Sequence, residues 1–283
     1  MIVHLIDGTY ELFRHFFGAP PRQDSNGREV GAVVGAVRSL FDLVAPGAHI
    51  GIATDHVIES FRNDMYPGYK TGDGIDPVLL AQFPIFEAAL EACGFALWPM
   101  TKYEADDALA SAAALAVETG ATEVRIYTPD KDLSQCVGGV VVQVDRRKRE
   151  TIDTEAVQAK FGVLPESIPD YLGLVGDSAD GFPGLPGWGA KSAGVVLAAY
   201  HHLENIPADA DAWTIQVRGA TKLAATLQAQ FEDAVLFRDL ATLRTDAPVG
   251  QPEDWVWNPS RPSVEAWAES AGVNGVLTKV RWT

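Results

Sequence analysis

The sequence predicts an α/β fold with a central, mostly parallel sheet flanked by helices. Several short runs are continuously apolar, which is typical of strands buried on both faces of a sheet. Helical stretches lie between them, among them Gly31 to Val44 and Pro84 to Cys93, the latter followed by Gly94 as a helix stop. Strands that alternate with helices form parallel sheets covered on both faces, so these two observations define the fold class.

Each predicted strand is followed by an acid or by a Pro-Asp pair. The strands are Ile2 to Ile6, Ile50 to Thr54, Val124 to Thr128 and Val140 to Val144. Asp7, Asp55 and Asp130 follow the first three. The carboxyl ends of parallel strands share one edge of a sheet, where open α/β sheets bind their ligands. We therefore expect these three acids to lie at that edge.

A further helix is predicted from Glu104 to Glu118, where an apolar stripe recurs at three- and four-residue spacing. Glu104 and Asp107 share a neighbouring face, and Asp106 lies in the first turn, where the helix dipole favours acids. After about residue 160, helical signals dominate. We expect an α/β core over residues 1–170 and a helical region over residues 171–283, without a sharp linker between them.

The composition is that of a globular protein: 283 residues, 47% hydrophobic and 21% charged. No stretch approaches the roughly 20 apolar residues that span a bilayer, so we expect no membrane association. The first residues lack the positive region of a signal peptide, which favours the cytoplasm. Cys93 and Cys136 have no metal-type spacing, and we expect buried thiols rather than a disulfide.

Nine carboxylates form the principal candidate site: Asp7, Asp55, Glu104, Asp106, Asp107, Asp130, Asp132, Asp177 and Asp180. Mg²⁺ prefers oxygen ligands and is usually held by a few carboxylates beside substrate phosphate. Two ions about 4 Å apart can activate a water and stabilise the leaving oxygen of a displacement at phosphorus. Any one acid could be a helix cap or turn residue, and a calcium loop is a competing use of Asp177 to Asp180, although the twelve-residue calcium pattern is absent. Acids in five separate segments favour a divalent-metal site.

The net charge of −16 taken alone argues against a nucleic-acid partner, because binding to phosphate normally relies on a basic surface. The nine carboxylates account for more than half of that charge. Two divalent cations would make their surroundings attractive to phosphate. The remaining acidity is typical of a solvated surface.

The segment Phe182 to Ala193 joins a glycine-rich turn to a helical run. It is not a nucleotide-binding phosphate loop, because Ala190 separates Gly189 from Lys191. We interpret it as a helical hairpin whose glycine amides and helix N-terminus bind a nucleic-acid phosphate, with Lys191 adding charge. A loop that merely joins two helices is the alternative.

Three basic segments have weaker signals. The segment Phe61 to Lys70 interleaves cations with aromatics, which suits phosphate contact and base stacking but also an ordinary surface loop. Arg14, on the helix after Asp7, either reaches a phosphate or stays on the surface. The run Arg146 to Arg149 is interpreted as a solvated hairpin turn, with duplex contact as the alternative.

In this order, the motifs resemble the 5′-nuclease family, which includes flap endonucleases and the 5′-to-3′ exonuclease domain of bacterial DNA polymerase I. The similarity is carried by Ile6-Asp7-Gly8, Phe61-Arg62, Tyr69-Lys70, Tyr103 to Asp107, Thr128 to Asp132, Gly176 to Asp180, the Pro-Gly hairpin and Leu243 to Asp246. No polymerase sequence follows within these 283 residues, so the chain is similar to the stand-alone form.

The resemblance implies a PIN-like fold with a helical arch at about 62–92 and a helix-three-turn-helix element at about 172–200. It also implies two sites for Mg²⁺ or Mn²⁺. Asp7, Asp55, Glu104, Asp106, Asp107 and Asp130 match positions around the first ion, and Asp132, Asp177 and Asp180 match the second.

The resemblance further implies that Lys70 and Arg62, at the base of the arch, contact the scissile phosphate and stabilise developing charge. Arg14 would contact a flap or template phosphate. The expected DNA contacts are Tyr69, Gly184, Gly187, Gly189, Lys191 and Ser192, with a K⁺ ion held by the carbonyls of Leu185 and Trp188.

Two positions depart from the family pattern. An arginine is common three residues after the arch lysine, and Asp73 stands there in this chain, which removes one phosphate clamp. Val175 replaces a threonine that is frequent before Gly-Asp, and we expect little consequence from that change.

The sequence therefore predicts a Mg²⁺- or Mn²⁺-dependent 5′ nuclease, both 5′-to-3′ exonuclease and flap endonuclease, acting in replication or repair. Cleavage is expected near the junction of a 5′ single strand and a duplex. The expected partners are branched, nicked or 5′-ended DNA, including strands with an RNA primer, and the expected state is a monomer. The alternatives are an RNA-directed 5′ nuclease and a structure-specific DNA-binding module with little catalysis.

Overall fold

The structure is a computed structural model that describes residues 1–273, and its backbone groups into two compact units. The first consists of residues 1–60, residues 72–128 and the segment from residue 244 onward, and the second of residues 61–71 and 129–243. The predicted division near residue 170 rests on the change from strands to helices and stays a prediction. The end of its second part, residues 274–283, lies outside the described range.

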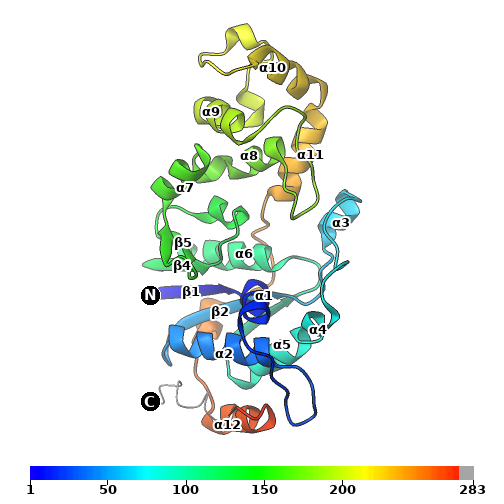
Figure 1. The fold of residues 1–283 in the computed structure, drawn as a ribbon. Helices are drawn as coiled ribbons and strands as arrows, with labels where there is room; N and C mark the ends of the chain where they lie inside the picture. The colour runs from blue at the N-terminus through cyan, green and yellow to red at the C-terminus, as the bar shows by residue number, and fades with distance from the viewer. Residues whose placement is uncertain (274–283) are drawn as a thin grey trace. The chain divides into compact units, whose positions relative to one another are not determined.

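In the described part of the chain, the first unit is built on four parallel strands in the order β3-β2-β1-β4 (Figure 1). They are β1 (Ile2–Asp7), β2 (His49–Asp55), β3 (Ala96–Met100) and β4 (Glu123–Tyr127). Asp7 lies opposite Ala53, and Asp55 lies opposite Met100. The predicted parallel sheet is confirmed, and β1 and β2 both end in an acid at the same edge.

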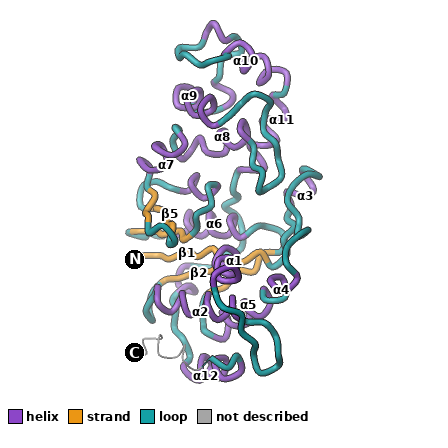
Figure 2. The backbone as a smooth tube through the Cα atoms, viewed as in Figure 1, coloured by secondary structure: helices purple, strands orange, loops and turns teal. Residues whose placement is uncertain are grey.

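Helices cover both faces of this sheet, as predicted. Helix α6 (Ala105–Glu118) lies on one face, and α1 (Gly8–Gly18), α2 (Gly31–Leu43) and α5 (Phe83–Ala92) lie on the other (Figures 1 and 2). The short helices α4 (Pro77–Leu80) and η5 (Pro252–Trp255) and helix α12 (Arg261–Ser270) complete the unit. Gly94 has a φ of +75°, a left-handed conformation that ends α5 as predicted.

Strand β3 was not predicted. It contains Pro99, and a proline lacks the N–H that a central strand must donate, so the sequence there does not read as a strand. The structure resolves the conflict by placing β3 at the edge of the four parallel strands, where proline is tolerated.

The segment after Arg244 returns to the first unit and fills part of its core. Trp255 and Trp257 are fully buried. The Trp257 ring stacks on Phe95 with 4.8 Å between ring centroids, and its indole N–H donates to the carbonyl of Cys93 at 2.9 Å. Cys93 is buried, which raises the pKa of its thiol to about 12 and confirms the prediction of a buried thiol. Cys136 is only half-buried, so the prediction was wrong for that thiol.

The second unit is mainly helical, as predicted for the chain beyond residue 160. Strands β5 (Val141–Asp145) and β6 (Glu150–Ile152) form an antiparallel hairpin, and the basic run is its turn, as predicted. The helices are α3 (Phe61–Met65), η1 (Asp132–Cys136), α7 (Thr154–Phe161), η2 (Pro165–Ser167), α8 (Ile168–Val175), α9 (Ala190–Tyr200), η3 (Leu203–Asn205), η4 (Ala210–Ala212), α10 (Ala220–Ala229) and α11 (Phe231–Ala241).

The core of the second unit forms where α8 packs against α11 and α9. Leu172, Leu174 and Leu197 are fully or almost fully buried in it, and the rings of Phe182 and Phe237 stack with 5.8 Å between their centroids. Phe182 comes from the glycine-rich turn after α8. The apolar core therefore fixes the turn that carries Asp177 and Asp180. No helix within residues 1–273 combines the length and apolar character needed to cross a bilayer.

Gly51 is the position in the sheet at which a small substitution should cost most. A Cβ added there would overlap the indole ring of Trp98 on the neighbouring strand. We expect Gly51→Ala to destabilise the protein by about 1–3 kcal/mol, the usual cost of overpacking a core, seen as a lower melting temperature in calorimetry. Gly18→Ala is the matched control, because nothing lies within 4 Å of its added Cβ. Equal melting temperatures for the two variants would contradict this account of the sheet.

Candidate metal centre and nucleic-acid interface

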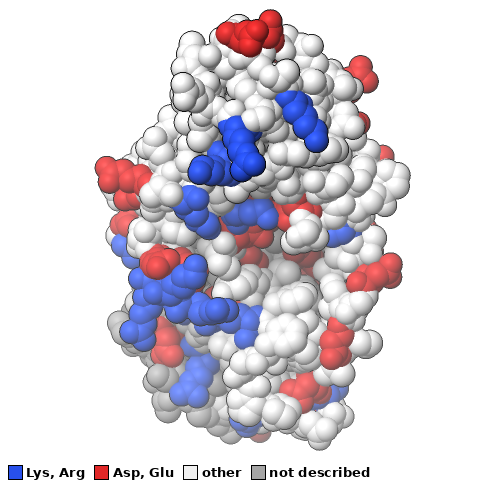
Figure 3. All heavy atoms as spheres, turned by 45° about the horizontal axis from the view of Figure 1, so that its top comes forward, with Lys and Arg blue, Asp and Glu red and all other residues white. Residues whose placement is uncertain are grey.

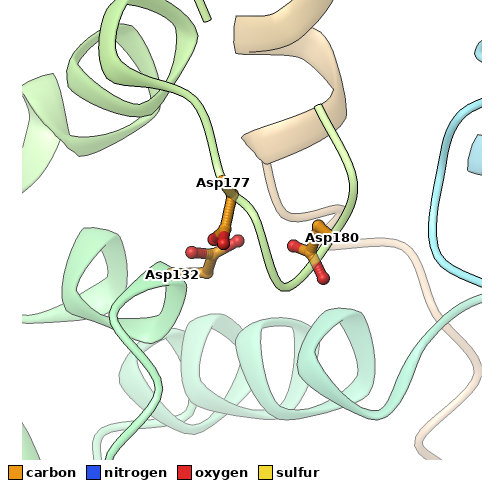
Figure 4. A group of neighbouring side chains, drawn as sticks. All are labelled: Asp132, Asp177 and Asp180. Carbon is orange, nitrogen blue, oxygen red and sulfur yellow. The ribbon is translucent and has the colours of Figure 1, made fainter. Parts of the chain in front are cut away.

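Three of the predicted acids come together in the second unit. Within residues 1–273, one carboxylate oxygen from each of Asp132, Asp177 and Asp180 lies within 4.8 Å of the others. Figure 4 shows Asp132 and Asp177 facing each other, with Asp180 farther along the loop that carries Asp177. Asp132 begins η1. The three acids matched to the second ion are therefore neighbours in the structure.

The loop that carries Asp177 and Asp180 is a tight turn set by glycines. Asp177 and Phe182 exchange backbone hydrogen bonds of 2.8 and 3.0 Å, and the Asp177 carboxylate accepts the N–H of Ala179 at 2.9 Å. Gly176 and Gly184 have φ values of +79° and +68°, and a Cβ on either would overlap the opposing backbone. Only glycine satisfies both conditions, so these residues hold the two acids in place.

Two lysines accompany the three acids. The Lys70 ammonium lies 2.9 Å from Oδ1 of Asp180, and the Lys70 N–H donates to the Asp180 carbonyl at 2.9 Å. The Lys131 ammonium lies 2.5 Å from Oδ2 of Asp177. Burial lowers the pKa of Lys131, but the hydrogen bond to Asp177 and the charges of Asp177, Asp132 and Asp130 outweigh it, so the net pKa is raised. Lys131 is therefore a cation.

Asp132 is the least compensated member of the cluster. It is 5% exposed, and its buried Oδ1 has no hydrogen-bond partner within the described residues. Burial and the negative charges of Asp130, Asp180 and Asp177 hold the pKa of Asp132 well above its usual range. A buried carboxylate oxygen without a partner is costly unless a cation binds it. The all-oxygen donor set therefore fits a hard divalent cation such as Mg²⁺ or Mn²⁺.

Several acids matched to the first ion gather at the strand ends of the first unit. Asp7 caps α1 by accepting the N–H of Tyr10 at 2.7 Å, and its second oxygen accepts the hydroxyl of Thr128 at 2.8 Å. Asp55 accepts the N–H of Ala105 at 2.9 Å, which ties the end of β2 to the start of α6. The predicted meeting of these segments at one sheet edge is confirmed for Asp7 and Asp55.

The acids at the start of α6 differ in burial, since Glu104 and Asp107 are buried and Asp106 is half-buried. Glu104 accepts the hydroxyl of Ser60 at 2.7 Å. Asp107 is fully buried, and its oxygens accept the N–H groups of Glu104 at 3.0 Å and Arg244 at 2.8 Å, so it caps α6 and holds the returning segment. Asp106 is half-buried.

Asp130 is exposed and accepts the N–H of Asp132 at 3.0 Å. Asp130 belongs to the second unit, whereas the other five acids matched to the first ion belong to the first unit. Their role as ligands therefore stays a prediction.

One buried acid of this region was missed by the sequence reasoning. Glu87, on α5, accepts the hydroxyl of Thr54 at 2.7 Å and pairs with Nδ1 of His56 at 2.7 Å. Thr54 and His56 are the two residues that flank Asp55 in the sequence. A single glutamate within a helical pattern has no distinguishing sequence signal. The acidity next to the end of β2 is therefore greater than the motifs indicate.

Arg62 and Tyr69 are both buried in the second unit. Arg62 is 1% exposed, and its guanidinium donates to the carbonyls of Leu240 at 2.7 Å and Thr242 at 3.1 Å. Tyr69 is packed in the core of the second unit. In this conformation neither side chain is presented to a phosphate or a base, because both are used to hold the segment 61–71 within its unit. The contacts predicted for them with nucleic acid stay a prediction.

Arg14 has partners within the first unit and is also partly exposed. Its guanidinium lies 2.5 Å from the buried Glu11 and donates to the hydroxyl of Ser39 at 3.2 Å, in the first unit. The side chain keeps about a quarter of its surface exposed. A phosphate contact by Arg14 stays a prediction.

The glycine-rich hairpin leads into a basic hollow of about 630 Å³ at the start of α9. Its lining includes Gly187, Gly189, Lys191, Ser192 and Arg218. The Ser192 hydroxyl oxygen accepts the N–H of Gly189 at 3.0 Å, which shapes the entry into the helix. Gly184 has the different role described above, in the loop that carries the acids.

A second hollow, of about 470 Å³, adjoins the first. Lys191 lines both hollows, and Lys160 lines the second. Figure 3 shows Lys and Arg side chains gathered on the face of this unit that carries α9 and α10. Lys160 and Arg218 were not predicted, because isolated cations in helices and loops have no motif. The two proposed potassium ligands are buried, and the carbonyl of Leu185 accepts the N–H of Trp188 at 3.1 Å.

The chain matches two known protein-family models. Residues 2–162 match the family model described as "5′-3′ exonuclease, N-terminal resolvase-like domain", and residues 163–263 match "5′-3′ exonuclease, C-terminal SAM fold". The chain belongs to the 5′-3′ exonuclease family. The recognition made from the motifs is confirmed, and so is the 5′-nuclease fold class.

Curated relatives of this 5′-3′ exonuclease family member include both short and long proteins. A 5′-3′ exonuclease of Aquifex aeolicus is 36% identical over 72% of this chain and 71% of that protein. DNA polymerase I of Bacillus caldotenax is 36% identical over 87% of this chain but 28% of its own length. DNA polymerase I of Pseudomonas aeruginosa is 34% identical over 93% and 29%. The chain thus spans less than a third of the polymerases that it matches.

Solved structures share the fold at low sequence identity. A flap endonuclease of bacteriophage T5, in a pseudo-enzyme-product complex with DNA and metal ions, has a TM-score of 0.66 at 18% identity and covers 99% of each chain. The catalytic core of Rad2 in complex with a DNA substrate has a TM-score of 0.61 at 16% identity, covering 99% of this chain and 92% of that one. At these identities the likeness concerns the fold alone.

Replacing Asp132 by asparagine should have opposite effects with and without metal. Asp132→Asn removes one of three neighbouring negative charges, so we expect the metal-free protein to melt about 2–4 °C higher. In a chain of this size, a gain of about 1 kcal/mol in the free energy of unfolding raises the melting temperature by that amount. The variant should also lose most of the stabilisation that added Mn²⁺ gives the wild type, since one ligand charge is missing. Thermal unfolding in EDTA and in excess Mn²⁺ measures both effects. Ser178→Ala, an exposed change on the same loop, is the control, and a lower melting temperature in EDTA for Asp132→Asn would refute the interpretation.

Proposed function

We propose that this protein is a divalent-metal-dependent 5′ nuclease that hydrolyses DNA phosphodiester bonds near junctions between a 5′ single strand and a duplex. The observation that carries the proposal is the cluster of Asp132, Asp177 and Asp180, in which one buried carboxylate oxygen lacks a hydrogen-bond partner within the described residues. Relatives named as a 5′-3′ exonuclease and as DNA polymerase I, and a like-folded flap endonuclease complexed with DNA and metal ions, support it.

The acids are assigned to two ions, Mg²⁺ or Mn²⁺. Asp132, Asp177 and Asp180 would hold one, and the other is assigned to Asp7, Asp55, Glu104, Asp106, Asp107 and Asp130. When bound, two such ions activate a water for attack at phosphorus and stabilise the leaving oxygen. Asp107 contributes chiefly by position, because its oxygens already accept two backbone N–H groups.

Lys70 is assigned to the scissile phosphate. Its ammonium lies beside Asp180, so a phosphate held at the acid cluster falls within its reach. Lys70 would donate to an oxygen of the phosphate in the transition state, once a divalent cation at the acids offsets the negative charge that retains its ammonium. Arg62 could assist only by leaving the carbonyls of Leu240 and Thr242, so we assign the principal role to Lys70.

The basic hollows are assigned to the duplex. Backbone N–H groups at the start of an eleven-residue helix, α9, favour an anionic ligand, and Lys191, Ser192, Gly187 and Gly189 lie there. We add Lys160 and Arg218 to this surface. A K⁺ ion held by the carbonyls of Leu185 and Trp188 belongs to the same proposal, because a carbonyl that accepts one N–H keeps a second lone pair.

Asp130→Ala should abolish Mg²⁺-dependent cleavage of a 5′-labelled DNA flap without unfolding the protein. Product mapping on matched flap, nicked and single-stranded substrates gives the polarity and the position of cleavage. Asp233→Ala removes an exposed acid of α11 and should leave cleavage unchanged. Retained cleavage by Asp130→Ala would refute the assignment, and faster cleavage of an RNA flap than of a DNA flap of the same shape would favour the RNA-directed alternative.

Lys191→Ala and Arg218→Ala should weaken duplex binding and also change its salt dependence. Each lost phosphate contact should reduce the slope of log K against log salt concentration by about 1, with little dependence on sequence. Fluorescence anisotropy with a labelled duplex, Ca²⁺ in place of Mg²⁺ and KCl between about 50 and 200 mM measures this slope. Lys102→Ala, an exposed cation outside both hollows, is the control. Unchanged slopes for both variants would remove the hollows from the binding surface.

A further inference from the structure

Lys131 has a position that the assignments above leave unexplained. It stands between Asp130 and Asp132 in the sequence, yet its side chain reaches across to the loop after α8. There its ammonium lies 2.5 Å from Oδ2 of Asp177. The side chain is 33% exposed, so it reaches a buried acid from an accessible position. It is therefore held at the cluster by charge rather than by packing.

Within residues 1–273, two lysines form ion pairs with the three acids of the cluster. Lys70 pairs with Asp180 and Lys131 pairs with Asp177, while Oδ1 of Asp132 has no partner within the described residues. Each ammonium thus occupies a carboxylate oxygen that a divalent ion would otherwise take. Lys70 has a further assignment at the phosphate, and Lys131 has none.

An ammonium and a divalent ion would compete for Oδ2 of Asp177. A Mg²⁺ ion lies about 2.0–2.1 Å from its oxygen ligands and demands near-ideal octahedral geometry. The Lys131 ammonium already fills the space in front of Oδ2 of Asp177, and two cations at that separation repel each other strongly. Movement of the lysine away from Asp177 would relieve this repulsion when an ion binds, and its flexible, partly exposed side chain allows the movement.

We propose that Lys131 is a tethered counter-cation of the Asp132, Asp177 and Asp180 cluster. It neutralises Asp177 when no metal is bound, and the second divalent ion displaces it. Lys131 is thus a positioning residue that stabilises the metal-free state and lowers the affinity of the second metal site. The inference rests on the proposed assignment of that site, but it concerns metal loading rather than cleavage.

The test compares Lys131→Met, which keeps most of the side-chain length without the charge, with Lys131→Arg, which keeps a cation. In EDTA, Lys131→Met should melt about 2–4 °C below the wild type, the effect of about 1 kcal/mol in a chain of this size. In saturating Mn²⁺ the two melting temperatures should converge. Titration calorimetry with Mn²⁺ should show the weaker site binding about tenfold more tightly in Lys131→Met, equivalent to about 1.4 kcal/mol. Lys131→Arg should retain stability in EDTA close to that of the wild type.

Lys148→Met is the matched control. Lys148, whose side chain is 60% exposed, pairs with the buried Asp145, with 3.8 Å between the charged atoms, and contacts none of the three acids in a recorded ion pair, so its loss should leave Mn²⁺ affinity unchanged. A purely structural role for Lys131 predicts a lower melting temperature in both EDTA and Mn²⁺ with no gain in affinity, and that result would overturn the proposal. Unchanged or weaker Mn²⁺ binding by Lys131→Met would overturn it too. Wild-type protein that binds two Mn²⁺ ions but cleaves no DNA would contradict the proposed function while leaving this inference intact.

Discussion

The electrostatic repulsion among Asp132, Asp177 and Asp180 is the constraint on which the second unit depends. Three carboxylates with oxygens within 4.8 Å of one another, two of them buried, are unfavourable unless cations are present. The chain tolerates the arrangement because other forces impose it. Phe182 is packed in the core, and close backbone contacts at Gly176 and Gly184 leave the loop little freedom. Packing energy therefore holds acids in positions that only a cation can stabilise.

The first unit uses its acids differently. At the ends of β1 and β2, Asp7 and Asp55 accept N–H groups that begin α1 and α6, and Asp107 joins α6 to the returning segment at Arg244. These carboxylates stabilise the fold whether or not metal is present. An alanine change at such a position would disturb helix caps as well as ligands, so loss of activity alone would be ambiguous. The cluster of Asp132, Asp177 and Asp180 gives clearer information about metal binding, since Oδ1 of Asp132 has no hydrogen-bond partner within the described residues.

Much of the fold was predictable because it depends on local patterns. Continuous apolar runs predicted β1, β2 and β4, and helical spacing predicted α2, α5 and α6. The exceptions depend on contacts between residues distant in the sequence. Because β3 contains Pro99, the sequence did not predict a strand there, and only the position of β3 at the sheet edge explains it. Trp255 and Trp257 lie in a segment without periodicity, and their burial depends on partners distant in the sequence, such as Phe95 for Trp257.

The candidate site divides in the same way. Acids at short spacing identified Asp132, Asp177 and Asp180 as members of a larger candidate set, and the family resemblance grouped these three together. The alternation of cations and aromatics around Arg62 indicated an exposed surface, yet the carbonyls of Leu240 and Thr242 keep its side chain inside the unit. The Lys131–Asp177 pair could not be predicted, because the two residues lie on different loops. Sequence patterns identified the acids, whereas their lysine partners required the structure.

The most direct measurement of the central claim is anomalous diffraction from crystals of the full chain soaked in Mn²⁺. The account predicts a strong anomalous peak coordinated by Asp132, Asp177 and Asp180, with the Lys131 side chain turned away from Asp177. Crystals soaked in Mn²⁺ that retain the Lys131–Asp177 ion pair and have no peak between the three acids would contradict it.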